Sequence, residues 1–343
     1  MDIALLGEFG FIERLTKDFT VKNNTTVKGV GDDCAVIDAG EKYLLLTTEL
    51  ILEGIHFDLV YTPLKHLGYK AVVMACSDVC AMNGRPKQLT VSIGLSARFT
   101  VEQIEELYQG IHLACEEYGI DMVGGDTTAS MTGLALSLTA IGEVEKEKVV
   151  YRSGASDTDL VCVTGDLGAA YMGVKLLERE KQVLEGNNVS QPKFSGYEYL
   201  LERQLKPRLR IDVIDALEEA SILPTSMMDI SDGLSSEMLH ICKASSKGAR
   251  IYLDRLPISS KTFDLAEEMG VDPVIAALNG GDDYELLFTV PVSKYEDVMR
   301  IGGIDVIGHM TPESKGVALT TPDGAEIAMQ APGWHKQEKQ NDK

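Results

Sequence analysis

Hydrophobic and polar residues alternate along three segments in the first half of the chain, as expected for β-strands with one buried face. Between them lie two longer segments of helical character, one after Pro63 and one with apolar residues every three or four positions. The pattern predicts strands at 43–50, 88–95 and 134–144 in one shared sheet, and helices at 64–82 and 101–118. Strands and helices therefore alternate in this half.

The helix predicted at 101–118 carries its own start and stop signals. Thr100 and Gln103 have the spacing of a capping box, in which each side chain bonds the backbone N–H of the other residue. Gly119 follows the last apolar position and suits the left-handed conformation that often ends a helix. Local chemistry thus sets both ends of this helix.

The chain turns polar at 149–159, where Arg152-Ser153-Gly154-Ala155 precede a new apolar run, and we place a domain boundary there. Because 343 residues exceed the usual size of one core, we predict two domains, residues 1–150 and 151–343. The second domain is predicted to hold strands at 160–164, 249–253, 285–290 and 305–308, and helices at 169–180, 197–205, 211–220, after Gly233 and after Ser260. We also expect a surface loop at 185–196, a mobile polar tail at 335–343, and a ligand cleft between the domains.

The chain is strongly acidic, with 53 Asp and Glu against 32 Lys and Arg and a formal charge of −21. Such a charge repels nucleic acid and anionic membranes, so neither is an expected partner, and a phosphate ligand would arrive with cations. The six cysteines form no Cys-x-x-Cys pair and lie in apolar surroundings, which predicts reduced core residues. The chain shows no signal-peptide pattern and no apolar run of membrane-spanning length, so we expect a cytoplasmic protein.

Aspartate follows glycine or serine in several separate segments. These are Gly31-Asp32-Asp33, Ser77-Asp78, Gly124-Gly125-Asp126, Asp229-Ile230-Ser231-Asp232-Gly233 and Gly280-Gly281-Asp282-Asp283. Any one of them alone is also ordinary turn chemistry. However, carboxylate oxygens suit Mg²⁺, glycines let a polyphosphate approach the backbone, and carboxylates at the ends of apolar segments need partners. Together the segments predict a divided magnesium and phosphate site.

Several common nucleotide-binding and hydrolase motifs are missing from the sequence. There is no Gly-Lys dipeptide and hence no P-loop, and Cys34 stands at the third glycine position of a possible Rossmann motif that begins at Gly29. No His-Glu-x-x-His or Gly-x-Ser-x-Gly motif supports zinc hydrolysis or acyl transfer. Magnesium-assisted phosphoryl transfer remains, and there positioning and charge neutralisation supply most of the rate. A phosphate acceptor, with a second pKa near ~6, would need no general base.

Taken in order, these segments resemble the thiamine-monophosphate kinase family, of the superfamily that includes aminoimidazole ribonucleotide synthetase and selenophosphate synthetase. The likeness covers nearly the whole chain. The blocks that carry it are Gly7-Glu8-Phe9, Gly31-Asp32-Asp33-Cys34-Ala35, Thr47-Thr48-Glu49, Glu53-Gly54-Ile55-His56-Phe57, Ser77-Asp78-Val79-Cys80-Ala81-Met82, Gly124-Gly125-Asp126-Thr127-Thr128, Arg152-Ser153-Gly154-Ala155, Thr164-Gly165-Asp166-Leu167-Gly168, Asp229-Ile230-Ser231-Asp232-Gly233-Leu234 and Gly280-Gly281-Asp282-Asp283-Tyr284-Glu285-Leu286.

The resemblance implies an α+β fold of two α/β-type domains, with an N-terminal metal- and ATP-binding sheet that pairs across a homodimer. It implies direct in-line transfer of the ATP γ-phosphoryl group to thiamine monophosphate, without a phosphoenzyme or a catalytic base. By similarity, several Mg²⁺ ions would be held by Asp32, Asp33, Thr47, Thr48, Glu49, Asp78, Asp126, Asp229 and Asp232. ATP would contact Tyr118, Gly125, Arg152 and Ser231, and thiamine monophosphate would contact His56, Asp282 and Trp334.

Two residues depart from the family pattern. Glu49 stands where the family usually has aspartate, and Asp282 where it usually has glutamate. Each keeps its charge but moves the carboxylate by about one methylene, which affects a metal that demands near-octahedral ligands at ~2.1 Å.

Other functions remain open at this point. Selenophosphate synthetase chemistry would need a reactive cysteine in an N-terminal loop, and residues 1–31 contain none. Aminoimidazole ribonucleotide synthesis stays open, as does a non-catalytic nucleotide- or metal-binding protein, which would show no turnover. Individual residues also have structural interpretations: His56 as a core histidine, Trp334 as a C-terminal clamp and Arg152 as a turn cap.

Overall fold

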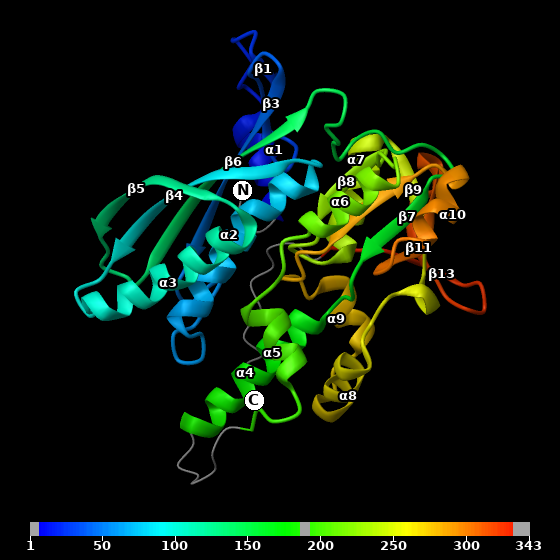
Figure 1. Cartoon of the computed structure of the whole chain (residues 1–343). Helices are drawn as coiled ribbons and strands as arrows, with labels where there is room; N and C mark the ends of the chain where they lie inside the picture. Colours follow the sequence, from blue (N-terminus) through cyan, green and yellow to red (C-terminus); the bar gives the residue numbers. More distant parts are fainter. Residues whose placement is uncertain (1–6, 186–192, 332–343) are drawn as a thin grey trace.

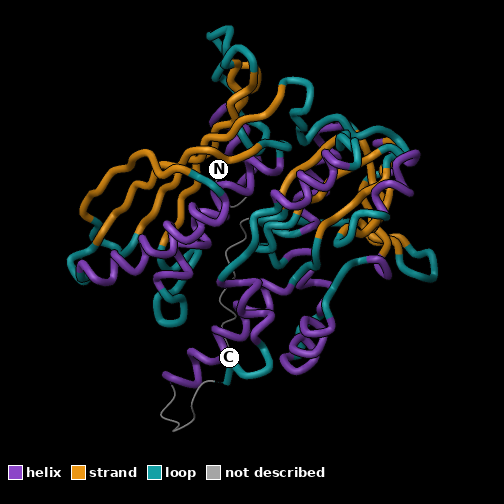
Figure 2. The backbone as a smooth tube through the Cα atoms, in the orientation of Figure 1, coloured by secondary structure: helices purple, strands orange, loops and turns teal. Residues whose placement is uncertain are grey.

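The computed structural model describes residues 7–185 and 193–331, which form a six-stranded and a seven-stranded sheet with helices packed on them. Figure 1 shows the two sheets in separate halves of the molecule, with α2 on the side of the first sheet that faces the second half. Figure 2 shows the strands of each sheet beside their covering helices. The fold is therefore α+β, as the resemblance implied.

The N-terminal half contains α1 (Gly7–Thr16), β1 (Thr26–Lys28), β2 (Ala35–Asp38), β3 (Lys42–Leu52), α2 (Leu64–Ala81), β4 (Arg85–Leu95), α3 (Val101–Tyr118), β5 (Asp121–Ala129) and β6 (Ala135–Glu145). Its strand order is β1-β2-β3-β6-β4-β5, antiparallel except for the pair of β4 with β5. Leu45, Val91 and Leu138 are buried beneath α2 and α3. The opposite face is more open, since Thr48 and Leu50 are exposed there.

Helices α2 and α3 cross closely because glycines stand at the contact. A Cβ atom on Gly68 would lie 2.0 Å from the Leu107 carbonyl oxygen, and one on Gly110 would lie 1.9 Å from the Lys65 carbonyl oxygen. Neither distance leaves room for a side chain. The predicted capping box is present at Thr100 and Gln103, so this helix begins as expected.

The C-terminal half contains β7 (Leu160–Thr164), α4 (Ala169–Glu185), α5 (Glu198–Leu205), α6 (Ile211–Glu219), β8 (Ser226–Asp229), α7 (Leu234–Ser245), β9 (Lys247–Tyr252), α8 (Ser260–Met269), α9 (Pro273–Asn279), β10 (Leu286–Val290), α10 (Tyr295–Met299), β11 (Ile304–Pro312), β12 (Val317–Thr320) and β13 (Glu326–Ala328). Its strand order is β13-β12-β9-β11-β7-β10-β8. Edge strand β8 ends at Asp229 and packs against α2 of the other half. One hydrophobic cluster crosses this contact and includes Val72, Met227 and Phe288.

Every helix and strand that the hydrophobic pattern predicted is present, with ends that differ by a few residues. Strands β3, β6 and β4 lie side by side in one sheet, as predicted. The pattern missed β5 because it is exposed along its whole length and contains two glycines, and it missed short elements such as β8 and α9. The domain boundary at residue 150 stays a prediction; part of the expected loop at 185–196, and the expected tail, lie outside the described residues.

All six cysteines are buried and unpaired, in agreement with reduced core residues. Burial raises the pKa of the Cys76 and Cys80 thiols, so neither is an available nucleophile. None of the helices within 7–185 and 193–331 is both long and apolar enough to cross a bilayer.

Substitution of Gly110 by alanine tests the close helix crossing. We expect Gly110→Ala to destabilise the protein by about 2 kcal/mol, because the new methyl group forces α2 and α3 apart. Alanine is otherwise the better helix former by about 1 kcal/mol, so destabilisation cannot come from helix propensity. The measurement is urea unfolding, with the exposed neighbour Gln109→Ala as control. Equal or higher stability of Gly110→Ala would refute the crossing.

Candidate active site

Three aspartates from both halves of the chain meet where α2 packs against β8. One carboxylate oxygen each of Asp33, Asp78 and Asp229 lies within 4.8 Å of the others. Asp33 precedes β2, Asp78 lies near the end of α2, and Asp229 ends β8. Ser77 on α2 donates a hydrogen bond to Asp229 Oδ2 at 2.6 Å, which ties the two halves together. The sequence predicted all three aspartates, and the fold brings them into one carboxylate cluster.

Burial makes the negative charge of this cluster costly. It raises the pKa of Asp33 to about 7, and the Arg152 guanidinium offsets part of that rise. Burial also raises the pKa of Asp78 well above its usual range, and the charges of Asp229 and Asp33 raise it further. Arg152 donates to Asp33 Oδ1 from Nε at 3.1 Å and from Nη2 at 2.6 Å. The cluster is thus suited to a cation beyond this one arginine.

The oxygen atoms in this cluster fit Mg²⁺. Asp32 Oδ2 and Asp33 Oδ2 are buried and accept no hydrogen bond from any residue that the structure describes, although Lys28 Nζ forms an ion pair with Asp32 Oδ2 at 3.6 Å. Buried carboxylate oxygens normally have a hydrogen-bond partner, so Asp33 Oδ2 above all has capacity for a metal. All the cluster ligands are hard oxygens, as Mg²⁺ prefers, and the thiolate and imidazole ligands typical of zinc are not among them.

Other predicted metal ligands surround the carboxylate cluster. Asp32 Oδ1 accepts a hydrogen bond from the Arg152 backbone N–H at 3.0 Å, and the Thr47 hydroxyl donates to Asp78. Glu49 is close enough to contribute to the raised pKa of Asp78, after burial and the two aspartates. Asp232 likewise adds to the raised pKa of Asp229, for which burial is the main cause.

Two predicted metal ligands lie elsewhere. The Thr48 hydroxyl donates to the Leu138 carbonyl oxygen at 3.2 Å, on the face of β3 opposite Thr47, because successive strand residues point to opposite faces. Asp126 lies on the exposed edge strand β5, opposite Ser92, and is not a member of the three-carboxylate group. Their metal-binding roles stay predictions.

The residues predicted to contact ATP are similarly divided. Arg152 is bound to the cluster, and Ser231 lies on the loop between Asp229 and Asp232. Gly125 lies on β5, where a Cβ atom would come within 1.9 Å of the Val91 carbonyl oxygen, so strand pairing requires glycine there. Tyr118 lines a separate cavity and bonds the Tyr69 hydroxyl at 2.8 Å.

A cavity of about 740 Å³ adjoins the Ser231–Asp232 loop and takes its walls from both halves. His56 from the N-terminal half and Asp282 from the C-terminal half both line it. Both were predicted to contact the same substrate, and contact with one ligand requires them to share a cavity. His56 Nδ1 accepts a hydrogen bond from the Leu52 backbone N–H at 3.0 Å, and burial lowers the pKa of this imidazole. Trp334, the third predicted substrate contact, lies outside the described residues.

Asp282 has a left-handed backbone with φ of 62°, which is uncommon for a residue other than glycine. Its backbone N–H donates to the Ser231 carbonyl oxygen at 2.8 Å, and that of Tyr284 donates to Ile230 at the same distance. Its carboxylate accepts hydrogen bonds from Lys70 Nζ at 2.9 Å and from the Tyr284 hydroxyl at 3.0 Å. Burial alone would raise the pKa of Asp282, but the Lys70 ammonium and these hydrogen bonds lower it.

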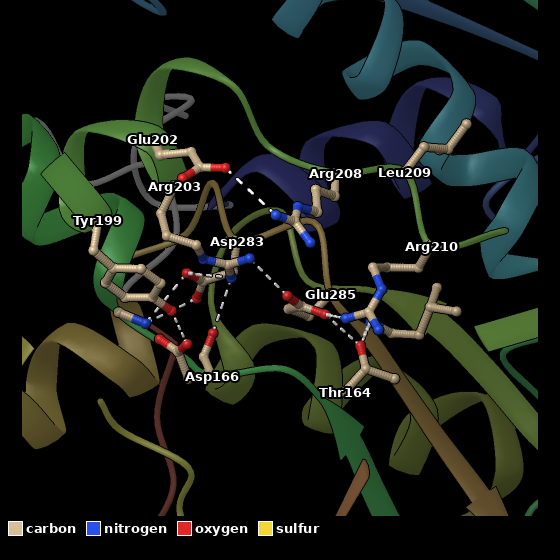
Figure 3. Close-up of polar contacts among 12 residues, drawn as sticks. Thr164, Asp166, Tyr199, Glu202, Arg203, Arg208, Leu209, Arg210, Asp283 and Glu285 are labelled. Atoms are coloured by element: carbon tan, nitrogen blue, oxygen red, sulfur yellow. Dashed lines mark hydrogen bonds and ion pairs between the residues drawn. The ribbon is translucent and has the colours of Figure 1, made fainter. Parts of the chain in front are cut away.

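A buried ionic network holds the residues that follow Asp282 (Figure 3). Glu285 accepts hydrogen bonds from Thr164, from Arg203 Nη1 at 2.8 Å, and from Arg210. Asp283 accepts from the Gly168 backbone N–H at 3.0 Å, and burial raises the pKa of its carboxyl to about 8. These contacts hold Asp283 and Glu285 in place, next to Asp282, which lines the cavity.

Sequence reasoning missed Glu237, which is 1% exposed in α7. Its Oε1 accepts hydrogen bonds from the backbone N–H groups of Ser231 at 3.2 Å and Asp232 at 2.8 Å. It therefore anchors the loop that carries the Asp229–Asp232 carboxylates. The sequence feature that could have revealed Glu237 is an acidic residue in the first turn of a helix that begins after Gly233. A side chain at such a position can accept hydrogen bonds from backbone N–H groups that precede the helix. Lys70 was missed too, because a lysine inside an apolar helix gives no distinctive pattern.

Two family models match this chain. "AIR synthase related protein, N-terminal domain" matches residues 31–144, and "AIR synthase related protein, C-terminal domain" matches residues 159–320. The chain is 34% identical to thiamine-monophosphate kinase of Aquifex aeolicus, over 97% of this chain and 99% of that protein. It is 30% identical to thiamine-monophosphate kinase of Bacillus subtilis, over 96% of this chain and 99% of that protein.

A solved structure described as "AaThiL complexed with AMPPCP and TMP" superposes on this chain with a TM-score of 0.80 and 34% identity. It covers 95% of this chain and 96% of its own. The hydrogenase maturation protein HypE of E. coli, at 18% identity and a TM-score of 0.68, shares the fold. The similarity therefore extends through both halves of the chain.

The raised pKa of Asp33 predicts how pH acts on the metal-free protein. Since the pKa rises from 3.8 to about 7 on folding, the folded state holds a proton that the unfolded chain releases, and stability is lost as pH rises through this window. In EDTA we expect Asp33→Asn to gain melting temperature relative to wild type more at pH 8 than at pH 5. Mg²⁺ should stabilise wild type more at pH 8 than at pH 5. Differential scanning fluorimetry measures both, and pH-independent differences would contradict the buried site.

Proposed function

Because this chain belongs to the thiamine-monophosphate kinase family, we propose that its two halves together phosphorylate thiamine monophosphate with ATP, giving thiamine diphosphate. The observation that carries this proposal is the position of the carboxylate cluster. Asp229 of the cluster ends β8, and Ser231 and Asp232 of the 740 Å³ cavity follow in the next loop, so a metal-bound polyphosphate and an acceptor would meet there. We place the acceptor in this cavity, against His56 and Asp282.

We propose that Mg²⁺ is bound by Asp33, Asp78 and Asp229, with Asp32, Thr47, Glu49 and Asp232 completing the site. When bound, Mg²⁺ would neutralise charge on the phosphates and hold them in position. The Arg152 guanidinium bonds Asp33 of the cluster and would also bind the nucleotide phosphates.

The reaction needs no base from the protein. The acceptor is a phosphate monoester whose second pKa near ~6 leaves it ionised at neutral pH, so its oxygen can attack without losing a proton. That oxygen forms a bond to the γ-phosphorus, and the bond from that phosphorus to the bridging oxygen breaks, so ADP leaves with the electron pair. The protein's part is to align the two phosphates and to reduce their repulsion.

Replacement of Asp78 tests this function. We expect Asp78→Asn to lower kcat/KM for thiamine diphosphate formation by at least ~100-fold, because it removes a charged cluster ligand without changing side-chain size. The control is Asp264→Asn, an exposed aspartate on α8, which should keep wild-type activity. The assay resolves thiamine species after incubation with ATP and Mg²⁺, with an EDTA blank. Wild-type-like activity of Asp78→Asn, or no thiamine diphosphate from wild type, would refute the proposal.

We also propose that two copies of the chain associate through the N-terminal sheet. Strand β5 is the last strand of that sheet and is exposed along its whole length, which leaves backbone groups open to another strand. Apolar side chains accompany it, since Met122 is 43% and Val123 57% exposed. A second copy would cover this edge and the open face that carries Leu50. A cytoplasmic location stays a prediction.

Light scattering after size-exclusion chromatography tests this association. We expect wild type to have about twice the 37.3 kDa mass of one chain, and Val123→Lys to shift toward the single-chain mass. Val292→Lys is the matched control, because Val292 is also 57% exposed but lies in the C-terminal half. A single-chain mass for wild type, or an unchanged dimer in Val123→Lys, would contradict the proposed interface.

A further inference from the structure

Lys70 is a buried cation at the contact between the two halves. Its side chain lies on α2 and is only 8% exposed. Its Nζ donates to Asp282 Oδ2 at 2.9 Å, so a lysine of the N-terminal half bonds an aspartate of the C-terminal half. Burial of an ammonium group is costly unless it is paired, and one hydrogen bond uses one of its three N–H donors. An anion that reaches this position could therefore bond the other two donors.

The position of Lys70 places this charge beside the acceptor cavity. Asp282 and His56 both line the cavity, and the Lys70 ammonium is close enough to His56 to lower the pKa of this imidazole in addition to burial. Asp282 N–H bonds the Ser231 carbonyl oxygen, so this part of the wall adjoins the loop that leads to Asp229. The ammonium thus lies next to Asp282, a residue of the cavity wall, although Lys70 does not itself line the cavity.

The charges around the cavity explain why a cation is needed there. Asp232 and Asp282 both line it, and a phosphate acceptor would add about −1.5 to −2 at pH 7. Lys181 also lines the cavity, but its Nζ binds Asp58 at 2.7 Å and lies 3.8 Å from Glu185, so two carboxylates already offset its charge, whereas Lys70 is bound to Asp282, whose backbone N–H bonds Ser231. Lys70 is therefore better placed to receive the phosphate end of an acceptor that faces the cluster.

We propose that Lys70 binds the phosphate group of the acceptor and holds it for attack on the nucleotide. This inference rests on the proposed function and adds a residue to its acceptor site. The ammonium would donate to a phosphate oxygen while it keeps Asp282 as its second partner. No proton moves to or from Lys70 in the transfer; its role is to offset repulsion between the two phosphates as they approach.

The competing explanation is that Lys70 only pairs with Asp282. Thiamine and thiamine monophosphate differ by the phosphate group alone, so binding of the two compounds separates a phosphate contact from a packing role. We would measure both affinities by isothermal titration calorimetry, with Mg²⁺ and a non-hydrolysable ATP analogue present. The variants are Lys70→Met, Lys70→Arg and, as control, Lys65→Met at an exposed position of the same helix.

We expect Lys70→Met to weaken binding of thiamine monophosphate roughly 10-fold to 100-fold, as loss of a charge-assisted hydrogen bond does. Its affinity for thiamine should change less than about 3-fold, and kcat should fall with acceptor affinity while the Kd of the ATP analogue stays constant. Lys70→Arg, which keeps the charge, should recover part of the loss. Lys65→Met should match wild type for both ligands. Equal losses for thiamine and thiamine monophosphate would overturn the proposal.

The double variant Lys70→Met/Asp282→Asn guards against misfolding from an unpaired aspartate. If Lys70 only neutralises Asp282, the double variant should bind thiamine monophosphate as well as Asp282→Asn does, and this result would also overturn the proposal. If Lys70 binds phosphate, the double variant stays weaker than Asp282→Asn. A wild-type chain that makes no thiamine diphosphate would instead refute the proposed function itself. The two failures are therefore distinguishable.

Discussion

The repulsion between buried carboxylates at the contact of the two halves is the constraint on which the site depends. Asp33 and Asp78 come from one half and Asp229 from the other, and their oxygens lie within 4.8 Å. Protons or cations must offset this charge. Arg152 offsets part of it in the described structure, and Ser77 bonds Asp229 across the contact. A bound metal would thus favour the same arrangement of the halves that the hydrophobic cluster between α2 and β8 favours.

Buried hydrogen bonds hold the part of the cavity wall that lies next to these carboxylates, the Ser231–Asp232 loop and the segment that begins at Asp282. Glu237 bonds the backbone of the loop after Asp229, and backbone hydrogen bonds join that loop to the Asp282 segment. Three residues after Asp282, Glu285 accepts hydrogen bonds from Arg203 and Arg210. Such a buried network is costly to break, because each lost partner leaves an unpaired charge. The left-handed backbone of Asp282 is therefore held by its surroundings rather than by its own preference.

Local chemistry made much of the fold predictable from the sequence, because long apolar periods and capping signals act within one segment. The helix from Val101 to Tyr118 is an example, with its capping box at Thr100. Strand β5 was missed, since its pattern reflects an exposed edge and not a buried face. The sequence identified aspartates as candidate metal ligands, but only the fold shows that Asp33, Asp78 and Asp229 lie close together. Thr48 and Asp126 were predicted from the same resemblance as Thr47 and Asp78; Thr48 points to the opposite face of β3 from Thr47, and Asp126 lies on edge strand β5 outside the three-carboxylate group, so their roles stay predictions.

The carboxylate cluster is best tested by anomalous diffraction from crystals grown with Mn²⁺, which takes the place of Mg²⁺ at oxygen sites and scatters strongly enough to be located. A metal site formed by both halves predicts Mn²⁺ in direct contact with carboxylate oxygens of Asp33 and Asp78 and also of Asp229. Manganese bound only to aspartates of one half, or absent from the cluster at millimolar concentration, would contradict the central claim that the two halves share one metal site.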